Sequence, residues 1–231
     1  MSLKEDLEEQ VKNIFKTTWT TRNGQVVPAD NSIKFLNDAV ILDATVLYAD
    51  LDASTNLVDS YKPKFAAEIY KTFLYCSAKI IRDCGGEITA YDGDRIMAVF
   101  LGGVKNTQAA KAGLKINGAV KKIINPSLTK YYPNDSYVVK HVVGIDTSEI
   151  HVAKTGIRGS NDLVWVGRAA NYAAKLCCLP SDYPTWITHT VYNSLANEAK
   201  YGKDNKNMWE AISWTSMNNF SIYRSSWWWG L

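Results

Sequence analysis

The stretch that decides the fold covers residues 44–55 and reads ATVLYADLDAST. Apolar and polar side chains alternate up to Leu51, which predicts a β-strand over residues 44–51. The strand ends beside Asp50, and a carboxylate next to an apolar run is costly unless it is paired or binds a metal ion. Asp52 lies two residues further on and would share a strand face with Asp50 if the strand continues. A third metal ligand and a surface or capping residue explain Asp52 about equally well.

A second acidic turn follows about forty residues later. The sequence YDGDR at residues 91–95 joins two short β-type runs, residues 87–91 and 95–101, and its Asp-Gly pair is a strong hairpin signal. The hairpin would carry Asp94 at its tip. If the two strand ends are adjacent, Asp50 and Asp94 could share two divalent cations. Mg²⁺ and Mn²⁺ prefer oxygen ligands and commonly bridge phosphates, so the pattern suggests a site for a nucleoside triphosphate.

Hydrophobic periodicity places the other elements around these two segments. Helices are predicted at residues 1–14, 63–84, 106–124 and 168–176, strands at 137–145, 149–153, 163–166 and 186–188, and a helical turn at 191–195. The order β-α-β-β-α-β with additions predicts an α+β, ferredoxin-like fold, with helices on an antiparallel sheet and an added C-terminal aromatic strand. We expect one domain, with residues 1–42 as an N-terminal helix and preamble, 43–195 as the core and 196–231 as a Trp-rich extension.

Composition narrows the class of protein. The chain has 231 residues, of which 46% are hydrophobic and 21% charged, so it should bury an ordinary core. A net charge of +3 without a basic cluster argues against a general nucleic-acid binder. The apolar stretches are too short to span a bilayer, and the N-terminus does not resemble a signal peptide. We therefore expect a soluble, cytoplasmic protein with no membrane or nucleic-acid partner.

Cysteine, histidine and tryptophan suggest packing rather than chemistry. The cysteines lack CxxC spacing, which favours buried thiols over structural zinc; they are Cys76, Cys84, Cys177 and Cys178. The three histidines lack the spacing of a zinc site or a nucleophile triad, so packing or surface roles are expected. Five of the eight tryptophans fall in the last 23 residues. Because basic residues are sparse there, a buried or subunit-covered edge strand is favoured over a platform for stacking bases.

The predicted helix after Gly167 carries three polar side chains on one face. Arg168, Asn171 and Lys175 have i, i+3 and i+7 spacing, whereas the opposite face is mostly alanine and leucine. By base rate, a solvated face is the simpler explanation of such a pattern. A functional face becomes the better explanation when the other segments are considered with it.

Five segments in this order resemble the catalytic domain of class III nucleotidyl cyclases, over roughly residues 43–195. The first is the strand YADLDAST at 48–55, which is similar to the FADIVGST pattern of that family. The others are GG at 85–86 with GDRIMAVF at 93–100, GI at 144–145, GIRGS at 156–160, and the helix that begins at Gly167. Each motif alone is weak, but five in register are specific.

The resemblance implies a reaction in which the ribose 3′-oxygen attacks the α-phosphorus and pyrophosphate leaves. It implies that Asp50 and Asp94 bind two Mn²⁺ or Mg²⁺ ions with help from the Leu51 carbonyl, that the loop through Thr55 holds the β- and γ-phosphates, and that Asn171 orients the ribose. Lys175 stands where the family has a transition-state arginine, and Arg168 or Arg158 would compensate for the lost planar fork. The family forms head-to-tail dimers, so Asn171 and Lys175 would serve the aspartates of the other subunit.

The base pocket departs from the family's purine pattern. Adenylate and guanylate cyclases usually place Lys or Glu four residues before the hairpin aspartate, where this chain has Ala90. The second purine-reading position, three before the helix glycine, is Val164. The chain therefore looks most like the bacterial pyrimidine cyclases of Pycsar antiphage systems, which make cyclic UMP or cyclic CMP for a separate effector protein. Tyr48 and Arg95 are the candidates for contacts to the smaller base, although Tyr48 could equally be a core aromatic.

We therefore expect a homodimeric uridylate cyclase. A cyclic CMP synthase, a purine cyclase with a divergent base pocket, and a degenerate cyclase-like module that only binds nucleotide remain as alternatives. The expected catalytic residues are Asn171, Lys175 and Arg168. The expected metal ligands are Asp50, Leu51 and Asp94. The expected substrate contacts are Tyr48, Leu51, Asp52, Ala53, Ser54, Thr55 and Arg95.

Overall fold

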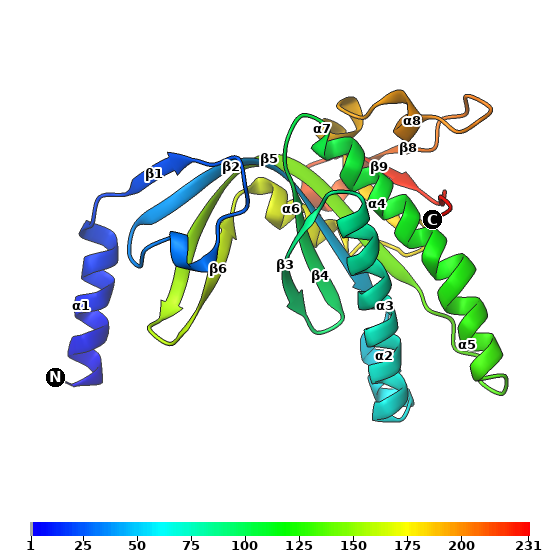
Figure 1. Cartoon of the computed structure of the whole chain (residues 1–231), viewed down its shortest axis with the longest axis horizontal. Coiled ribbons are helices and arrows are strands. Elements are labelled where there is room, and N and C mark those ends of the chain that lie inside the picture. The colour runs from blue at the N-terminus through cyan, green and yellow to red at the C-terminus, as the bar shows by residue number, and fades with distance from the viewer. Residues whose placement is uncertain (1) are drawn as a thin grey trace.

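The computed structural model describes residues 2–231 and is built around a nine-stranded mixed sheet (Figure 1). The strand order is β3-β4-β2-β5-β7-β9-β8, with β1 beside β2 and β6 beside β5. The strands are β1 (Thr20–Asn23), β2 (Asp38–Leu51), β3 (Glu87–Asp92), β4 (Arg95–Phe100), β5 (His141–Ile157), β6 (Ser160–Val166), β7 (Thr185–Thr188), β8 (Glu210–Trp214) and β9 (Phe220–Ser225). Most neighbours are antiparallel, but β1 runs parallel to β2 and β7 parallel to β5. The α+β class is confirmed.

The central pair, β2 and β5, is longer than its sequence pattern predicts. Residues 38–43 extend the expected strand at its N-terminal end, and the two strands expected at 137–145 and 149–153 form one continuous strand. The polar triplet 146–148 does not turn the chain because its groups find partners within the sheet. Thr147 Oγ1, for example, donates a hydrogen bond to the carbonyl oxygen of Ala44 on β2. A long, curved two-stranded arm therefore carries β1 and β6, together with the N-terminal helix, away from most of the other helices (Figure 1).

Helices cover the two faces of the sheet unequally. On one face lie α3 (Pro63–Asp83) and α4 (Lys105–Ala119), over a core that includes Leu47, Phe73 and Phe100. Pro63 starts α3 where its missing N–H costs nothing, and Gly85 ends it with a φ of 81°. On the other face, α6 (Arg168–Leu176) packs against β2 and β5 through small side chains.

The helix expected at 106–124 continues further than predicted. After α4 the chain passes through a π-helical turn, Val120–Ile124, and goes on into α5 (Asn125–Tyr131). Pro126 lies at the start of α5, where the wider turn before it accommodates the ring. The remaining helices are α1 (Leu3–Lys16), α2 (Ser54–Ser60), α7 (His189–Asn193) and α8 (Asn197–Lys200), with 3₁₀ turns at Asp30–Ser32 and Thr215–Met217.

The C-terminal extension adds two strands, β8 and β9, rather than one. Trp209 and Trp214 are buried, in agreement with the preference for an edge-strand role. The last residues then return to α4, where the side-chain amide of Asn117 donates to the Trp227 carbonyl at 2.7 Å and the Trp229 N–H donates to the Leu114 carbonyl at 3.0 Å. The aromatic tail is therefore part of the fold. Within residues 2–231, no helix has the length and apolar character needed to cross a bilayer.

The four cysteines are unpaired, and their environments differ from one another. Cys177 is buried and Cys76 and Cys84 are half-buried, as expected for packed thiols, but Cys178 is exposed. Among the described residues there is no cluster of three or more histidine, cysteine or acidic side chains.

Candidate active site

Asp50 and Asp94 lie together, as the sequence pattern predicts. Asp50 is the penultimate residue of β2, and Asp94 is in the turn between β3 and β4. Strand β4 pairs with β2 so that Ile96 is opposite Ala49, which brings the hairpin tip to the end of β2. Burial, and then the negative charge of Asp94, raise the pKa of Asp50 to about 6. The two carboxylates therefore interact through a poorly solvated space.

The unsatisfied polar groups of this pair fit a divalent cation. Oδ2 of Asp94 is buried without a hydrogen-bond partner, which is costly for a carboxylate oxygen. A hard cation between the two aspartates would satisfy that oxygen and remove their repulsion. With only two carboxylates present, the remaining ligands would be oxygens such as the Leu51 carbonyl and substrate phosphates. The donor set is typical of a Mg²⁺ or Mn²⁺ site that is completed by a nucleotide.

The hydroxyl-rich loop after β2 becomes the start of a helix that the sequence did not predict. Ala53 adopts a left-handed conformation, with φ 57° and ψ 33°, and α2 begins at the next residue. Ser54 and Thr55 are therefore in the first turn of α2, where backbone N–H groups have no acceptor within the helix. Asp52 is held differently: Ser181 Oγ donates to its Oδ2 at 2.6 Å. This bond makes an anchoring role for Asp52 the simpler of the two expectations.

Tyr48 occupies the middle of a row of side chains that crosses four strands. Ala90 of β3 pairs with Met97 of β4, which pairs with Tyr48 of β2, which in turn pairs with Gly144 of β5. The row therefore places the family's first base-reading position, Ala90, close to the Tyr48 ring. Tyr48 is half-buried, and burial raises the pKa of its hydroxyl.

Arg95 joins this row to the aspartate pair. Its guanidinium carbon lies 5.8 Å from the centre of the Tyr48 ring, and its Nε lies 3.3 Å from Oδ2 of Asp50. The Nε hydrogen of Arg95 is buried without a well-oriented acceptor, so the contact is electrostatic rather than a good hydrogen bond. Tyr48 and Arg95 thus form the polar part of this row, and Ala90 forms its apolar part.

The residues expected on α6 lie apart from the aspartates of the same chain. Asn171 and Lys175 are exposed on α6, and within residues 2–231 no hydrogen bond or ion pair joins them to Asp50 or Asp94. The Lys175 ammonium lies 3.7 Å from the sulfur of Met217. Both side chains therefore face solvent rather than the aspartates of their own chain.

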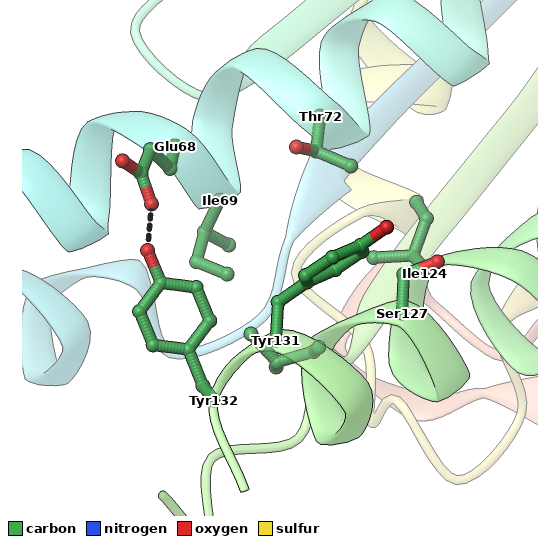
Figure 2. Close-up of a pocket in the computed structure, with 8 residues that line it drawn as sticks. Glu68, Ile69, Thr72, Ile124, Ser127, Tyr131 and Tyr132 are labelled. Atoms are coloured by element: carbon green, nitrogen blue, oxygen red, sulfur yellow. Dashed lines mark hydrogen bonds between the residues drawn. The ribbon is translucent and has the colours of Figure 1, made fainter.

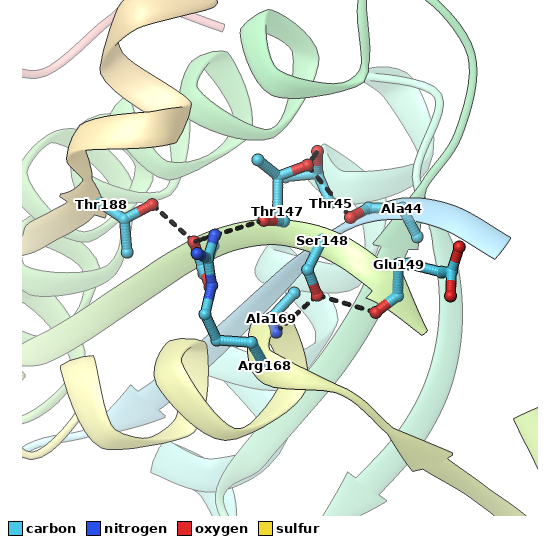
Figure 3. Close-up of polar contacts among 9 residues, drawn as sticks. Ala44, Thr45, Thr147, Ser148, Glu149, Arg168, Ala169 and Thr188 are labelled. Carbon is cyan, nitrogen blue, oxygen red and sulfur yellow. Dashed lines mark hydrogen bonds and ion pairs between the residues drawn. The ribbon is translucent and has the colours of Figure 1, made fainter. Parts of the chain in front are cut away.

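Arg168 differs from the expectation that it supports catalysis. Its Nε and Nη2 donate to the two carboxylate oxygens of Asp146 at 3.0 and 3.3 Å, and Nη2 also donates to the Thr147 carbonyl at 2.8 Å (Figure 3). Asp146 is fully buried on β5 and accepts a further hydrogen bond from Thr188 at 2.5 Å. The guanidinium is therefore engaged within its own chain, where it holds the start of α6 to the sheet.

The sequence reasoning missed Asp146, and one signal could have revealed it. An aspartate in the apolar strand HVVGID, followed by two hydroxyl residues, requires a buried cationic partner. A close approach of α6 and β5 completes this anchoring. A Cβ at Gly144 would lie 2.2 Å from the Ala173 carbonyl oxygen, so only glycine lets the helix pack this near the strand. The position of Asn171 and Lys175 depends on both contacts.

Solved structures with this fold are nucleotidyl cyclase domains. A bacterial light-regulated adenylyl cyclase superposes with a TM-score of 0.68 at 18% identity, over 81% of this chain and 52% of that one. A guanylyl cyclase superposes with a TM-score of 0.68 at 17% identity, over 81% of this chain and 93% of that one. No protein-family model matches the chain. These likenesses show that the chain has the fold of nucleotidyl cyclase catalytic domains.

Full-length relatives narrow this class further. A protein of Xanthomonas perforans named uridylate cyclase is 55% identical over 99% of both chains. The chain therefore belongs to the uridylate cyclase family.

Proposed function

We propose that this enzyme converts UTP to 3′,5′-cyclic UMP and pyrophosphate. The observation that carries the proposal is the unpartnered buried carboxylate oxygen of Asp94 beside Asp50, whose pKa burial and Asp94 raise to about 6, at the end of β2. Two carboxylates in this state are poised to bind a cation and, through it, a triphosphate. The relatives named uridylate cyclase support the choice of a uridine nucleotide.

In this mechanism a new bond forms between the ribose 3′-oxygen and the α-phosphorus, and the bond from that phosphorus to the bridging oxygen of pyrophosphate breaks. The proton of the 3′-hydroxyl is released to solvent. Asp50, Asp94 and the Leu51 carbonyl would hold two divalent cations. When bound, these would supply charge that lowers the pKa of the attacking hydroxyl and neutralises the leaving group. The first turn of α2 would contact the β- and γ-phosphates through backbone N–H groups of Ala53, Ser54 and Thr55.

The choice of base is assigned to Tyr48 and Arg95. Both lie on the side of the sheet that carries Asp50, and the apolar Ala90 in the same row offers no polar contact to a purine edge. A guanidinium and a phenol can each bond to the carbonyl oxygens of a pyrimidine. A site that leaves purine polar groups unpaired discriminates against purines, because each unpaired buried group costs free energy. Cyclic CMP synthesis is the nearest alternative, because cytosine shares one of these carbonyl oxygens.

A homodimer completes the site. Asn171 and Lys175 are exposed and do not contact the aspartates of their own chain, so we propose that they orient the ribose and stabilise the α-phosphate of substrate bound to the other subunit. Mixing inactive Asp94→Ala with inactive Lys175→Ala protein should then restore activity, because one of the two shared sites in the mixed dimer is intact. If the mixture stays as inactive as its components, the shared site is contradicted.

The product is proposed to act as a second messenger in the bacterial cytoplasm, where it switches on a separate effector protein during antiphage defence. The function itself is tested by incubating the protein with UTP and Mn²⁺ and identifying the product by mass spectrometry. Cyclic UMP should form with the wild type and be lost in Asp50→Ala and Asp94→Ala proteins that keep their circular dichroism. Undiminished turnover in both variants would contradict the metal assignment, and binding of UTP without turnover would favour a degenerate module.

A further inference from the structure

Helix α1 is an amphipathic helix without a partner. It spans Leu3–Lys16, has no buried residue, and begins with a capping box formed by Ser2 and Glu5. Its five apolar residues lie on one face and are between 43% and 84% exposed; they are Leu3, Leu7, Val11, Ile14 and Phe15. An isolated helix of this length is marginal in water, and most helices gain their stability by burying an apolar face. A helix with this face needs a surface to cover it.

The C-terminal end of α1 is hydrogen-bonded to the rest of the molecule. The buried side-chain amide of Asn37 donates to the carbonyls of Ile14 and Thr17, at 2.8 and 2.5 Å. These bonds set the direction in which α1 leaves the arm formed by β2 and β5. Figure 1 shows that α1 lies at one end of the longest axis and points to the same side as α2, α3 and α5, which lie at the other end. Helix α1 therefore does not fold back onto its own chain.

At that other end, an apolar groove lies between α3 and α5. It encloses about 350 Å³ and is lined mainly by Ile69, Ile124, Leu128 and Tyr131 (Figure 2). A hydrogen bond between Tyr132 and Glu68 joins the two helices beside it. Tyr131 is 71% exposed, so a large aromatic surface faces solvent. Its apolar lining suits the apolar side chains of a third helix packed against α3 and α5.

The charges of α1 and of the helical segment on one side of the groove are complementary. In the described part of the chain, the one charged residue that lines the groove itself is Glu68, whose carboxylate accepts a hydrogen bond from Tyr132. Four of the first nine residues are acidic, namely Glu5, Asp6, Glu8 and Glu9. Residues 105–132, which form α4, the π turn and α5, contain six lysines and no acidic residue. Over Leu3–Lys16, three lysines against four acids give a net charge of −1, which disfavours an anionic membrane surface as the partner of α1. A basic protein surface suits it better.

We propose that α1 of each subunit binds in the α3–α5 groove of a second copy of this chain. The proposal rests on the homodimer proposed above. A two-fold axis that relates the two copies head to tail exchanges the ends of the long axis, so the α1 end of each copy meets the α3–α5 end of the other. Each dimer would then contain two such contacts, which stabilise the dimer that forms the shared sites.

Photo-crosslinking of the full chain tests this contact directly. With p-benzoylphenylalanine in place of Leu7, ultraviolet light should yield a covalent dimer, and digestion should locate the adducts in the segments 68–75 and 123–132. The same group in place of Glu9, on the opposite face of α1, should yield at least tenfold less of this dimer. Adducts within α1 itself, or equal yields from the two positions, would overturn the proposal.

Analytical ultracentrifugation tests the same contact without a crosslinker, through the dissociation constant of the dimer. The double variant Leu7→Glu with Val11→Glu should weaken dimerisation at least tenfold, whereas Glu9→Gln should leave it unchanged. Because all three positions are exposed, none of these variants should affect folding of the body. Wild-type affinity in the double variant would overturn the contact. Cyclic UMP formation is measured on the same samples. An active dimer without α1 adducts contradicts only the proposed contact between α1 and the groove. A crosslinked dimer that is inactive toward every nucleotide contradicts only the proposed cyclase function.

Discussion

Nε of Arg95 lies 3.3 Å from Oδ2 of Asp50, so the residue proposed to read the base touches the residue proposed to bind metal. The two lie on paired strands, β4 and β2, and the register of that pair fixes their distance. Arg95 opposes the rise in the pKa of Asp50, although burial and Asp94 outweigh it. The proposed base recognition and the proposed metal binding would therefore be coupled through this ion pair.

Replacing Arg95 should lower activity toward UTP without abolishing it. In Arg95→Ala the base loses a charged donor, so kcat/KM for UTP should fall about 10- to 100-fold, which corresponds to one hydrogen bond to a charged group. Arg95→Lys keeps the charge but loses the planar guanidinium, so its kcat/KM should lie between those of the wild type and Arg95→Ala. Steady-state kinetics at saturating Mn²⁺ measure this. An unchanged kcat/KM in Arg95→Ala would remove Arg95 from the base pocket.

Asp94→Asn should separate activity from stability. Turnover should drop by at least about 10³-fold because a metal ligand is lost. In EDTA, however, the variant should be more stable than the wild type by about 1 kcal/mol, because it no longer places a second negative charge beside Asp50. Thermal unfolding should show a midpoint about 2–4 °C higher. A lower midpoint in EDTA would mean that the two carboxylates do not repel each other.

The stability of the protein should fall in mild acid because of His141. This side chain is buried, and burial, followed by the charge of Lys121, lowers its pKa to about 3. The folded state therefore resists a proton that the unfolded chain accepts near pH 6.5. The free energy of unfolding therefore has its full value above about pH 6.5 and should fall by about 2 kcal/mol by pH 5. Urea unfolding of wild type and His141→Gln at pH 7 and pH 5 measures the difference. The exposed His189→Gln variant is the control, and equal pH dependence in wild type and His141→Gln would refute the assignment.

The ion pair between Arg168 and Asp146 should contribute to stability rather than chemistry. Arg168→Ala leaves a buried carboxylate with only Thr188 as partner and should cost about 3–5 kcal/mol. Asp146→Asn should lower the free energy of unfolding by less than Arg168→Ala does. The double variant, Arg168→Ala with Asp146→Asn, should lose less than the sum of the two single losses, because the pair acts as a unit. Lys175→Ala, on the same face of α6, should change the free energy of unfolding by less than about 0.5 kcal/mol while it abolishes turnover. A catalytic role for Arg168 would instead appear as lost turnover at wild-type stability.

Local patterns in the sequence were sufficient to place the aspartate pair. An alternating strand that ends in Asp50 and an Asp-Gly hairpin that presents Asp94 are short-range features, and pairing of β2 with β4 brings them together. The α+β fold follows from the same elements. The helix α3 was predicted nearly to the residue because Pro63 and Gly85 mark its ends.

Long-range contacts explain what the sequence could not reveal. The spacing of Arg168, Asn171 and Lys175 identifies a common helix face but not what each side chain meets, and Arg168 meets Asp146 of its own chain. The residues 146–148 resemble a turn, and only Arg168, Thr188 and β2 make a continuous β5 possible. Likewise, the π turn that lets the helix pass Pro126 depends on packing around residues 120–124.

A competition experiment tests the central claim most directly. The wild-type enzyme is incubated with Mn²⁺ and equimolar UTP, CTP, ATP and GTP in one reaction, and the cyclic products are resolved by mass spectrometry at low conversion. The ratio of products then equals the ratio of kcat/KM values. We expect cyclic UMP to dominate by at least about tenfold, and this preference to narrow in Arg95→Ala. Predominant cyclic AMP or cyclic GMP would contradict the account.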